Sequence, residues 1–204
     1  LHAPQYGNMG LGTDEELLDW LEKYTYPAEA AFSDLRYADA EYGRFTEELR
    51  NSFTVRAVVF ATSHTPATLR LMEKLERSGL RSLVGKVSMD RNCPEGLRES
   101  SARAALEAVE DWLAAAAGRF ENVSPVLSPR FVPSCSMELL EGLGALSKRQ
   151  GLPVQSHLSE TPDEVAWVRA LHPDSASYTD IYRRCGLLGE RTVMAHCVDR
   201  RVPH

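Results

Sequence analysis

Long apolar segments and cysteine pairs are missing from this 204-residue sequence. No apolar run approaches the roughly 20 residues that a membrane-spanning helix requires, so neither a transmembrane protein nor a membrane partner is expected. The four cysteines (Cys93, Cys135, Cys185 and Cys197) form no C-x-x-C pair. We therefore expect reduced thiols in a cytosolic protein rather than a disulfide framework.

The sequence also lacks an excess of basic residues. Its 23 Lys and Arg residues are scattered and are outnumbered by 29 Asp and Glu residues, which gives a formal net charge of −6. No basic stripe could bind phosphates, so a nucleic-acid partner is not expected. No G-x-G-x-x-G follows a predicted strand, so a dinucleotide cofactor has no support. No signal peptide is recognisable, and Leu1 in place of Met predicts that residues are missing upstream.

Short β-branched runs alternate with longer amphipathic ones along the chain. The predicted strands are residues 55–62, 82–89, 123–131, 154–158 and 192–197. The predicted helices are residues 14–23, 35–50, 66–77, 99–117, 136–150, 162–171 and 177–185, with Thr65 and Ser136 as N-caps and Gly79 and Gly151 as stop signals. Strand followed by helix, repeated about five times, implies parallel strands with right-handed crossovers. A (β/α)8 barrel and an open doubly wound sheet both fit this α/β pattern.

Three histidines lie at the ends of apolar runs. His157 and His196 each end a predicted strand, and His2 stands at the start of the chain. Neutral imidazole is the commonest metal ligand and suits zinc, so histidines from separate strand ends could converge on one ion. The alternative is that each histidine only forms a hydrogen bond with a neighbour at its strand end.

Glu160 follows His157 by three positions in S-H-x-S-E. This spacing lets a metal-binding histidine and a carboxylate face the same small volume, where the carboxylate could take up a proton from water and pass it to a leaving group. The alternative is an ordinary acidic residue ahead of a helix, where it suits the helix dipole.

Three further residues could bind a flat heterocycle. Arg130 could hold a carbonyl group or an anion through its rigid fork of donors, and Gln5 can donate and accept at once, as the edge of a purine requires. Phe131 could stack on such a ring. A surface ion pair, a loop amide and a core aromatic are the respective alternatives.

Several motifs together carry a resemblance to a known family. They are H-A-P-Q-Y at 2–6, L-L-D-W-L-E-K-Y-T-Y-P-A-E at 17–29, V-G-K-V-S-M-D at 84–90, S-P-R-F at 128–131, Q-S-H-L-S-E at 155–160 and T-V-M-A-H at 192–196. In this order they resemble the guanine deaminases of the amidohydrolase superfamily. The resemblance extends over nearly the whole chain, to about Val198, and the W-L-x-x-Y-T-Y-P-A-E run is its most specific part.

The resemblance implies a (β/α)8 barrel that hydrolyses guanine to xanthine and ammonia. It implies one zinc ion per subunit that activates water, with His2, His157 and His196 as three of its ligands. His157 would also belong to the catalytic set, with Glu160 as the proton shuttle. Gln5, Arg130 and Phe131 would contact the purine, and a homodimer would be the expected assembly.

The resemblance also implies missing parts. The family's first metal histidine would lie two positions before His2, and its metal-binding aspartate would lie beyond the last predicted strand. Residues 1–198 would then be an incomplete barrel domain with about six of eight strands, followed by a tail, residues 199–204, that does not resemble the family. We expect a chain with these gaps to be impaired or inactive by itself.

Two other functions remain open from the sequence. A related enzyme could deaminate another aminated heterocycle, such as a triazine or an adenosine derivative. A shortened, non-catalytic isoform could instead act by pairing with an intact subunit.

Overall fold

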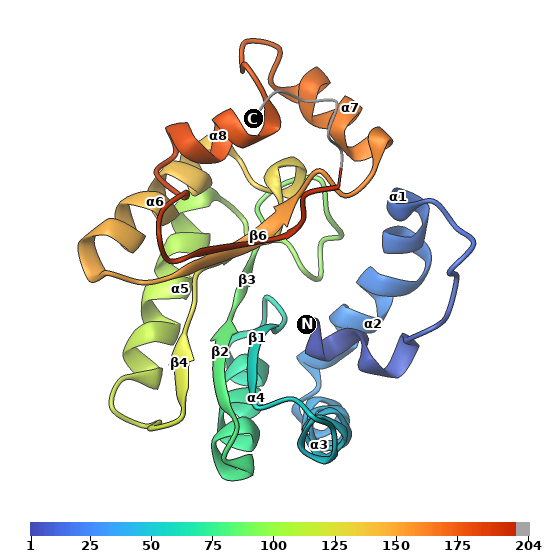
Figure 1. The fold of residues 1–204 in the computed structure, drawn as a ribbon, viewed down its shortest axis with the longest axis vertical. Helices are drawn as coiled ribbons and strands as arrows, with labels where there is room; N and C mark the ends of the chain where they lie inside the picture. Colours follow the sequence, from blue (N-terminus) through green and yellow to red (C-terminus); the bar gives the residue numbers. More distant parts are fainter. Residues whose placement is uncertain (199–204) are drawn as a thin grey trace.

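The computed structural model describes residues 1–198, and its strands are short and parallel (Figure 1). They are β1 (Arg56–Phe60), β2 (Arg81–Gly85), β3 (Val87–Ser88), β4 (Val123–Pro125), β5 (Ser128–Pro129), β6 (Val154–Leu158) and β7 (Thr192–His196). The predicted tail at 199–204 lies outside the described residues.

Backbone hydrogen bonds join these strands in chain order. The paired groups are β1-β2-β4, β3-β5 and β6-β7, and all of the pairs are parallel. Single parallel bridges add His2 beside Phe60 and connect Leu127 to Val154. The result is an arc that begins at the N-terminal segment and ends at β7, and it does not close into a barrel within residues 1–198. This is the arrangement expected of a partial (β/α)8 barrel.

Helices cover the arc. They are α1 (Leu17–Trp20), α2 (Tyr26–Ala30), α3 (Leu35–Asn51), α4 (Thr65–Ser78), α5 (Ala102–Ala116), α6 (Met137–Gln150), α7 (Pro162–Leu171) and α8 (Tyr178–Arg184). A π-helical turn, Leu21–Thr25, connects α1 to α2. Figure 1 shows this N-terminal helical segment on the side of the strands opposite to α5 and α6. None of the helices in this part of the chain has the length and hydrophobicity needed to cross a membrane.

Capping residues set several of the helix ends that the sequence predicts. The Ser136 side chain accepts a hydrogen bond from the Leu139 backbone N–H at the start of α6. Thr161 and Glu164 form a reciprocal capping box at the start of α7. Gly79 and Gly151 end α4 and α6 with φ of +77° and +66°, conformations that glycine adopts without steric cost.

The structure corrects four of the predicted elements. The first helix begins at Leu17 rather than at residue 14 and continues through the π turn to Ala30. Thr65 is the first residue of α4, and its N-cap is His64. The strands predicted at 82–89 and 123–131 are each divided in two, with Lys86 between β2 and β3 and residues 126–127 between β4 and β5.

Two apolar clusters stabilise the arc. The larger one packs α3 to α8 against the strands, around fully buried side chains such as Trp112, Leu71 and Leu139. The smaller one joins Leu21 and Tyr26 of the helical segment to Phe60, Met89 and Phe131. The smaller cluster therefore holds the N-terminal helical segment over the carboxyl ends of the strands.

Replacing Gly144 by alanine is expected to destabilise the protein by about 1–3 kcal/mol. The added Cβ would overlap the backbone carbonyl oxygen of Cys185, which cannot move independently. Urea unfolding measures the effect. Gly142→Ala in the same helix is the control, because its Cβ meets only the flexible end of Leu106 and gains about 0.8–1 kcal/mol of helix propensity. Equal stability of the two variants would contradict this account.

Candidate active site

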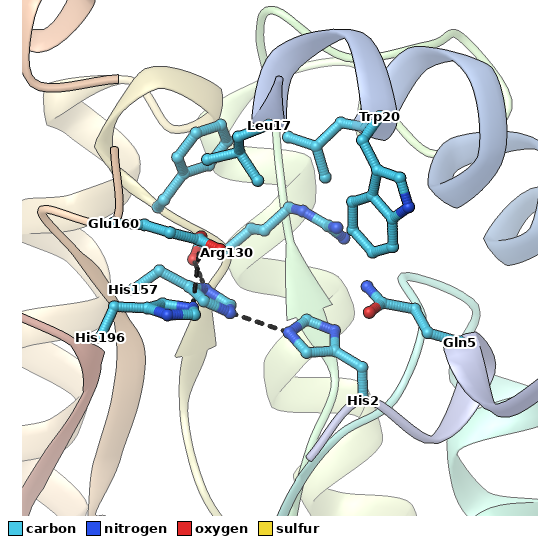
Figure 2. A pocket seen from close by; sticks show the side chains of 10 residues that line it. His2, Gln5, Leu17, Trp20, Arg130, His157, Glu160 and His196 are labelled. Atoms are coloured by element: carbon cyan, nitrogen blue, oxygen red, sulfur yellow. Dashed lines mark hydrogen bonds and ion pairs between the residues drawn. The ribbon is translucent and has the colours of Figure 1, made fainter. Parts of the chain in front are cut away.

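All seven side chains singled out in the sequence line one pocket (Figure 2). They are His2, Gln5, Arg130, Phe131, His157, Glu160 and His196. The pocket has a volume of about 160 Å³. Residues up to 194 positions apart in the chain (His2 and His196) therefore meet in one place.

The parallel arc explains this convergence. His2 is joined to the end of β1 through its bridge with Phe60, Arg130 follows β5, His157 lies in β6 and His196 ends β7. The carboxyl ends of parallel strands meet at one edge of the arc, so their last side chains surround a common volume.

Left-handed backbone conformations turn the chain at two of these strand ends. Ser159 has φ of +52°, and it reverses the chain between His157 and Glu160 so that both face the pocket. His196 and Cys197 have φ of +74° and +55°. Such conformations cost non-glycine residues of order 1–3 kcal/mol and gather at functional sites.

The N-terminal helical segment covers the side of the pocket opposite to the histidines. Leu17, Trp20 and Leu21 contribute its apolar lining, and Figure 2 shows Leu17 and Trp20 across the pocket from the histidines. The Trp20 indole N–H donates to the Leu11 carbonyl oxygen at 2.7 Å, which fixes the ring. The sequence analysis assigned these three residues no role, although they lie in the L-L-D-W-L-E-K-Y-T-Y-P-A-E motif.

The three imidazoles lie against one another. Nε2 of His2 is 2.8 Å from Nε2 of His157, and the ring centroids of His157 and His196 are 5.5 Å apart. The Phe60 ring stacks on His2 at 4.4 Å and on His157 at 4.6 Å. An aromatic wall therefore shields the paired nitrogens from water.

Burial keeps these imidazoles uncharged at neutral pH. It lowers the pKa of His157 to about 3, and burial, reinforced by His157, lowers the pKa of His2 well below its usual value. Burial also lowers the pKa of His196. Neutral imidazole is the form that binds a metal ion.

The hydrogen-bond pattern of the paired histidines fits a cation between them. Nδ1 of His157 lies 2.7 Å from the Arg130 carbonyl oxygen, which can only accept, so Nδ1 carries the proton and Nε2 has a free lone pair. Nδ1 of His2 is buried without a hydrogen-bond partner and lies 3.9 Å from a Glu29 carboxylate oxygen. With its proton on Nδ1, His2 would also present a lone pair at Nε2.

The rings are nevertheless not spaced for a metal ion. Two nitrogens bound to one tetrahedral zinc lie about 3.3 Å apart, so the His2 and His157 rings would have to separate slightly. Across residues 1–198, no group of three His, Cys, Asp or Glu side chains has the geometry to hold a metal ion. The types of donor atom fit zinc, whereas their present spacing does not.

Glu160 stands beside the third histidine. Its Oε2 lies 3.2 Å from Nε2 of His196. Burial, assisted by the charge of Glu164, raises the pKa of Glu160 to about 7. A carboxyl group with a pKa near 7 can both accept and release a proton at neutral pH.

Arg130 is held by a buried partner that the sequence analysis missed. Its Nη1 donates to Oε2 of Glu29 at 2.5 Å, and both side chains are buried. Its guanidinium also lies 5.1 Å from the centre of the Tyr26 ring. Burial alone would lower the pKa of Arg130, but the Glu29 carboxylate and Tyr26 raise it overall.

Gln5 and Phe131 complete the wall near Arg130. Nε2 of Gln5 donates to Oε1 of Glu29 at 3.1 Å, and Phe131 is 4% exposed and packs edge-on against Trp167. Donors from Arg130, the Gln5 amide and the Phe131 ring therefore line the same pocket as the imidazoles.

Comparison with known families gives one match that covers almost the whole chain. Residues 1–199 match the sequence profile of the Amidohydrolase family. The fold, the convergence at the strand ends and this match agree with one another.

Individual relatives agree with this family match. A curated guanine deaminase from Dictyostelium discoideum is 43% identical over 197 residues, 97% of this chain and 44% of that protein. The crystal structure of guanine deaminase from C. acetobutylicum with bound guanine superposes with a TM-score of 0.92 at 47% identity, covering 96% of this chain and 47% of that one. An adenosine deaminase from Xanthomonas campestris with bound zinc has the same fold, with a TM-score of 0.75 at 20% identity over 95% of this chain and 42% of its own. The chain thus spans about 44% of the length of the first of these relatives.

Proposed function

This chain belongs to the Amidohydrolase family, and on that premise we propose that the protein hydrolyses guanine to xanthine and ammonia. The observation that carries the proposal is the single pocket that joins three histidines and a carboxylate to Gln5, Arg130 and Phe131. The relatives of highest identity described above are guanine deaminases, one of them with guanine bound.

The binding wall suits an oxopurine. Arg130 offers a fixed fork of donors to a carbonyl oxygen, and Phe131 offers a flat surface to the ring. Gln5 adds an amide to the lining of the same pocket. A base that left such buried groups unpaired would lose about 1–3 kcal/mol per group.

His2, His157 and His196 are proposed to hold one zinc ion per subunit, through their Nε2 atoms. The neutral state of the rings and the lone pairs of the facing nitrogens support this assignment. When bound, such an ion would lower the pKa of a water molecule to about 7. The hydrogen bond from His157 Nδ1 to the Arg130 carbonyl would orient that ring.

Glu160 is proposed to transfer the protons of the reaction. It stands between the imidazoles and the binding wall, and its raised pKa suits a group that first accepts a proton and then releases it to the departing ammonia. The reaction balances without a further reactant, since guanine and water contain all the atoms of xanthine and ammonia.

The proposal also concerns the activity of this chain by itself, its assembly and its location. The open arc and the half-exposed Val193 of β7 support impaired activity of residues 1–204 by themselves. We propose a homodimer from the family resemblance alone. A cytosolic location is proposed from the unpaired cysteines Cys93, Cys135, Cys185 and Cys197.

His157→Ala in the complete gene product is expected to lower zinc affinity by at least about 100-fold, because a ligand is lost and its partner His2 is left facing an empty site. Titration with a competing chelator measures the affinity. His172→Ala is the control, since His172 caps the end of α7 and is not among the pocket residues. Zinc binding by His157→Ala equal to that of the wild type would remove His157 from the ligand set.

Glu160→Gln is expected to keep zinc bound and to lower kcat for guanine by about 10²–10⁴-fold, because the amide cannot carry the proton. Turnover is followed by xanthine formation, and zinc content by elemental analysis. The exposed Glu138 provides the matched control through Glu138→Gln. A kcat for Glu160→Gln close to the wild-type value would exclude Glu160 from proton transfer.

Arg130→Ala is expected to raise KM for guanine by about tenfold or more, because a buried donor fork to the base is lost. Thermal unfolding of the variant shows whether the loss of the Glu29 partner has disturbed the fold. Arg130→Lys, which keeps the charge but not the fork, should give an intermediate KM. An unchanged KM in a folded Arg130→Ala protein would show that Arg130 does not contact guanine.

A further inference from the structure

One buried carboxylate contacts the pocket residues from behind. Glu29 of α2 is 0% exposed and does not itself line the pocket. Its Oε2 accepts from Arg130 Nη1 at 2.5 Å, and its Oε1 accepts from Gln5 Nε2 at 3.1 Å. The same Oε1 lies 3.9 Å from Nδ1 of His2. Glu29 therefore faces three pocket residues that come from two other segments of the chain.

The ion pair fixes how the guanidinium meets the pocket. Both Glu29 and Arg130 are excluded from water, so each charge depends on the other for compensation. Nη1 of Arg130 is used by Glu29, and the Tyr26 ring lies along the guanidinium. Since the fork is planar and rigid, its remaining donors keep one direction toward the pocket.

The same carboxylate decides which end of the Gln5 amide faces the pocket. An ionised carboxylate accepts hydrogen bonds and donates none, so Gln5 must turn its NH₂ group toward Glu29. Its carbonyl oxygen is then left as an acceptor for a ligand. The pocket consequently offers an acceptor from Gln5 beside donors from Arg130.

We propose that Glu29 is a positioning residue that sets this donor–acceptor polarity and thereby selects 6-oxopurines over 6-aminopurines. This inference rests on the proposed purine substrate. Guanine and hypoxanthine present a ring N–H next to a carbonyl, which matches an acceptor beside donors. Adenine presents an acceptor nitrogen next to an amino group, which is the reversed pattern.

Glu29 also supports the histidine pair. Nδ1 of His2 has no hydrogen-bond partner, and a Glu29 carboxylate oxygen lies 3.9 Å from it. A proton on that nitrogen leaves Nε2 free to face His157. Loss of the carboxylate should therefore weaken zinc binding as well as base selection.

The test compares Glu29→Gln with the wild type, both as the complete gene product. Calorimetry gives the dissociation constants of hypoxanthine and adenine, and the ratio between them reports polarity without requiring turnover. The amide introduced by Glu29→Gln can donate or accept toward Gln5. The Gln5 amide is then free to flip, and the preference for hypoxanthine should fall by about tenfold or more. KM for guanine should rise by a similar factor while kcat changes much less, and zinc affinity should fall.

Two further variants serve as a control and as an alternative test. Glu22→Gln removes a charge from an exposed position of the same helical segment and should leave the ratio unchanged. Glu29→Asp retains the charge for Arg130 but is one methylene shorter, so an intermediate ratio is expected, and it carries the test if Glu29→Gln does not fold. A folded Glu29 variant with the wild-type ratio and KM would overturn the inference. Absence of guanine turnover in the wild type would instead overturn the proposed function, and the binding ratio would still decide the role of Glu29.

Discussion

The hydrogen bonds between consecutive parallel strands are the constraint on which this structure depends. Parallel ladders join β1, β2 and β4, then β3 and β5, then β6 and β7, and single bridges at His2 and Leu127 continue the series where the ladders are interrupted. Because every strand runs in the same direction, all of the carboxyl ends lie at one edge. The 2.8 Å approach of His2 to His157, 155 positions later, is a direct product of this order.

Much of this architecture could be predicted from residue patterns. β6 has the predicted limits, and the ends of α6 and α7 follow from Ser136, Gly151 and Thr161, whose local effects do not depend on the rest of the fold. All seven predicted site residues line one pocket. The sequence pattern indicates which residues lie near strand ends, and the parallel topology then brings these ends together.

What could not be predicted depends on contacts between distant segments. The extension of the first helix to Ala30 through a π turn is stabilised by the packing of Leu21 and Tyr26 on Phe60 and Phe131, which no helical periodicity reveals. In the sequence, Glu29 lies beyond the helix predicted at 14–23 and has no predicted role. Its burial and its pairing with Arg130, 101 positions away, exist only once the helical segment lies over the strand ends.

The chain order of the arc also sets the order in which the residues of the pocket are synthesised. A polypeptide emerges from the ribosome from its N-terminus at about 5–20 residues per second, and here each new strand adds to an edge that is already formed. The proposed base-binding group of Gln5, Glu29 and Arg130 is complete soon after β5 has been synthesised, whereas the proposed zinc ligand His196 follows about 65 residues later. The residues proposed to bind the base would therefore be synthesised before the last of the histidines proposed to bind zinc.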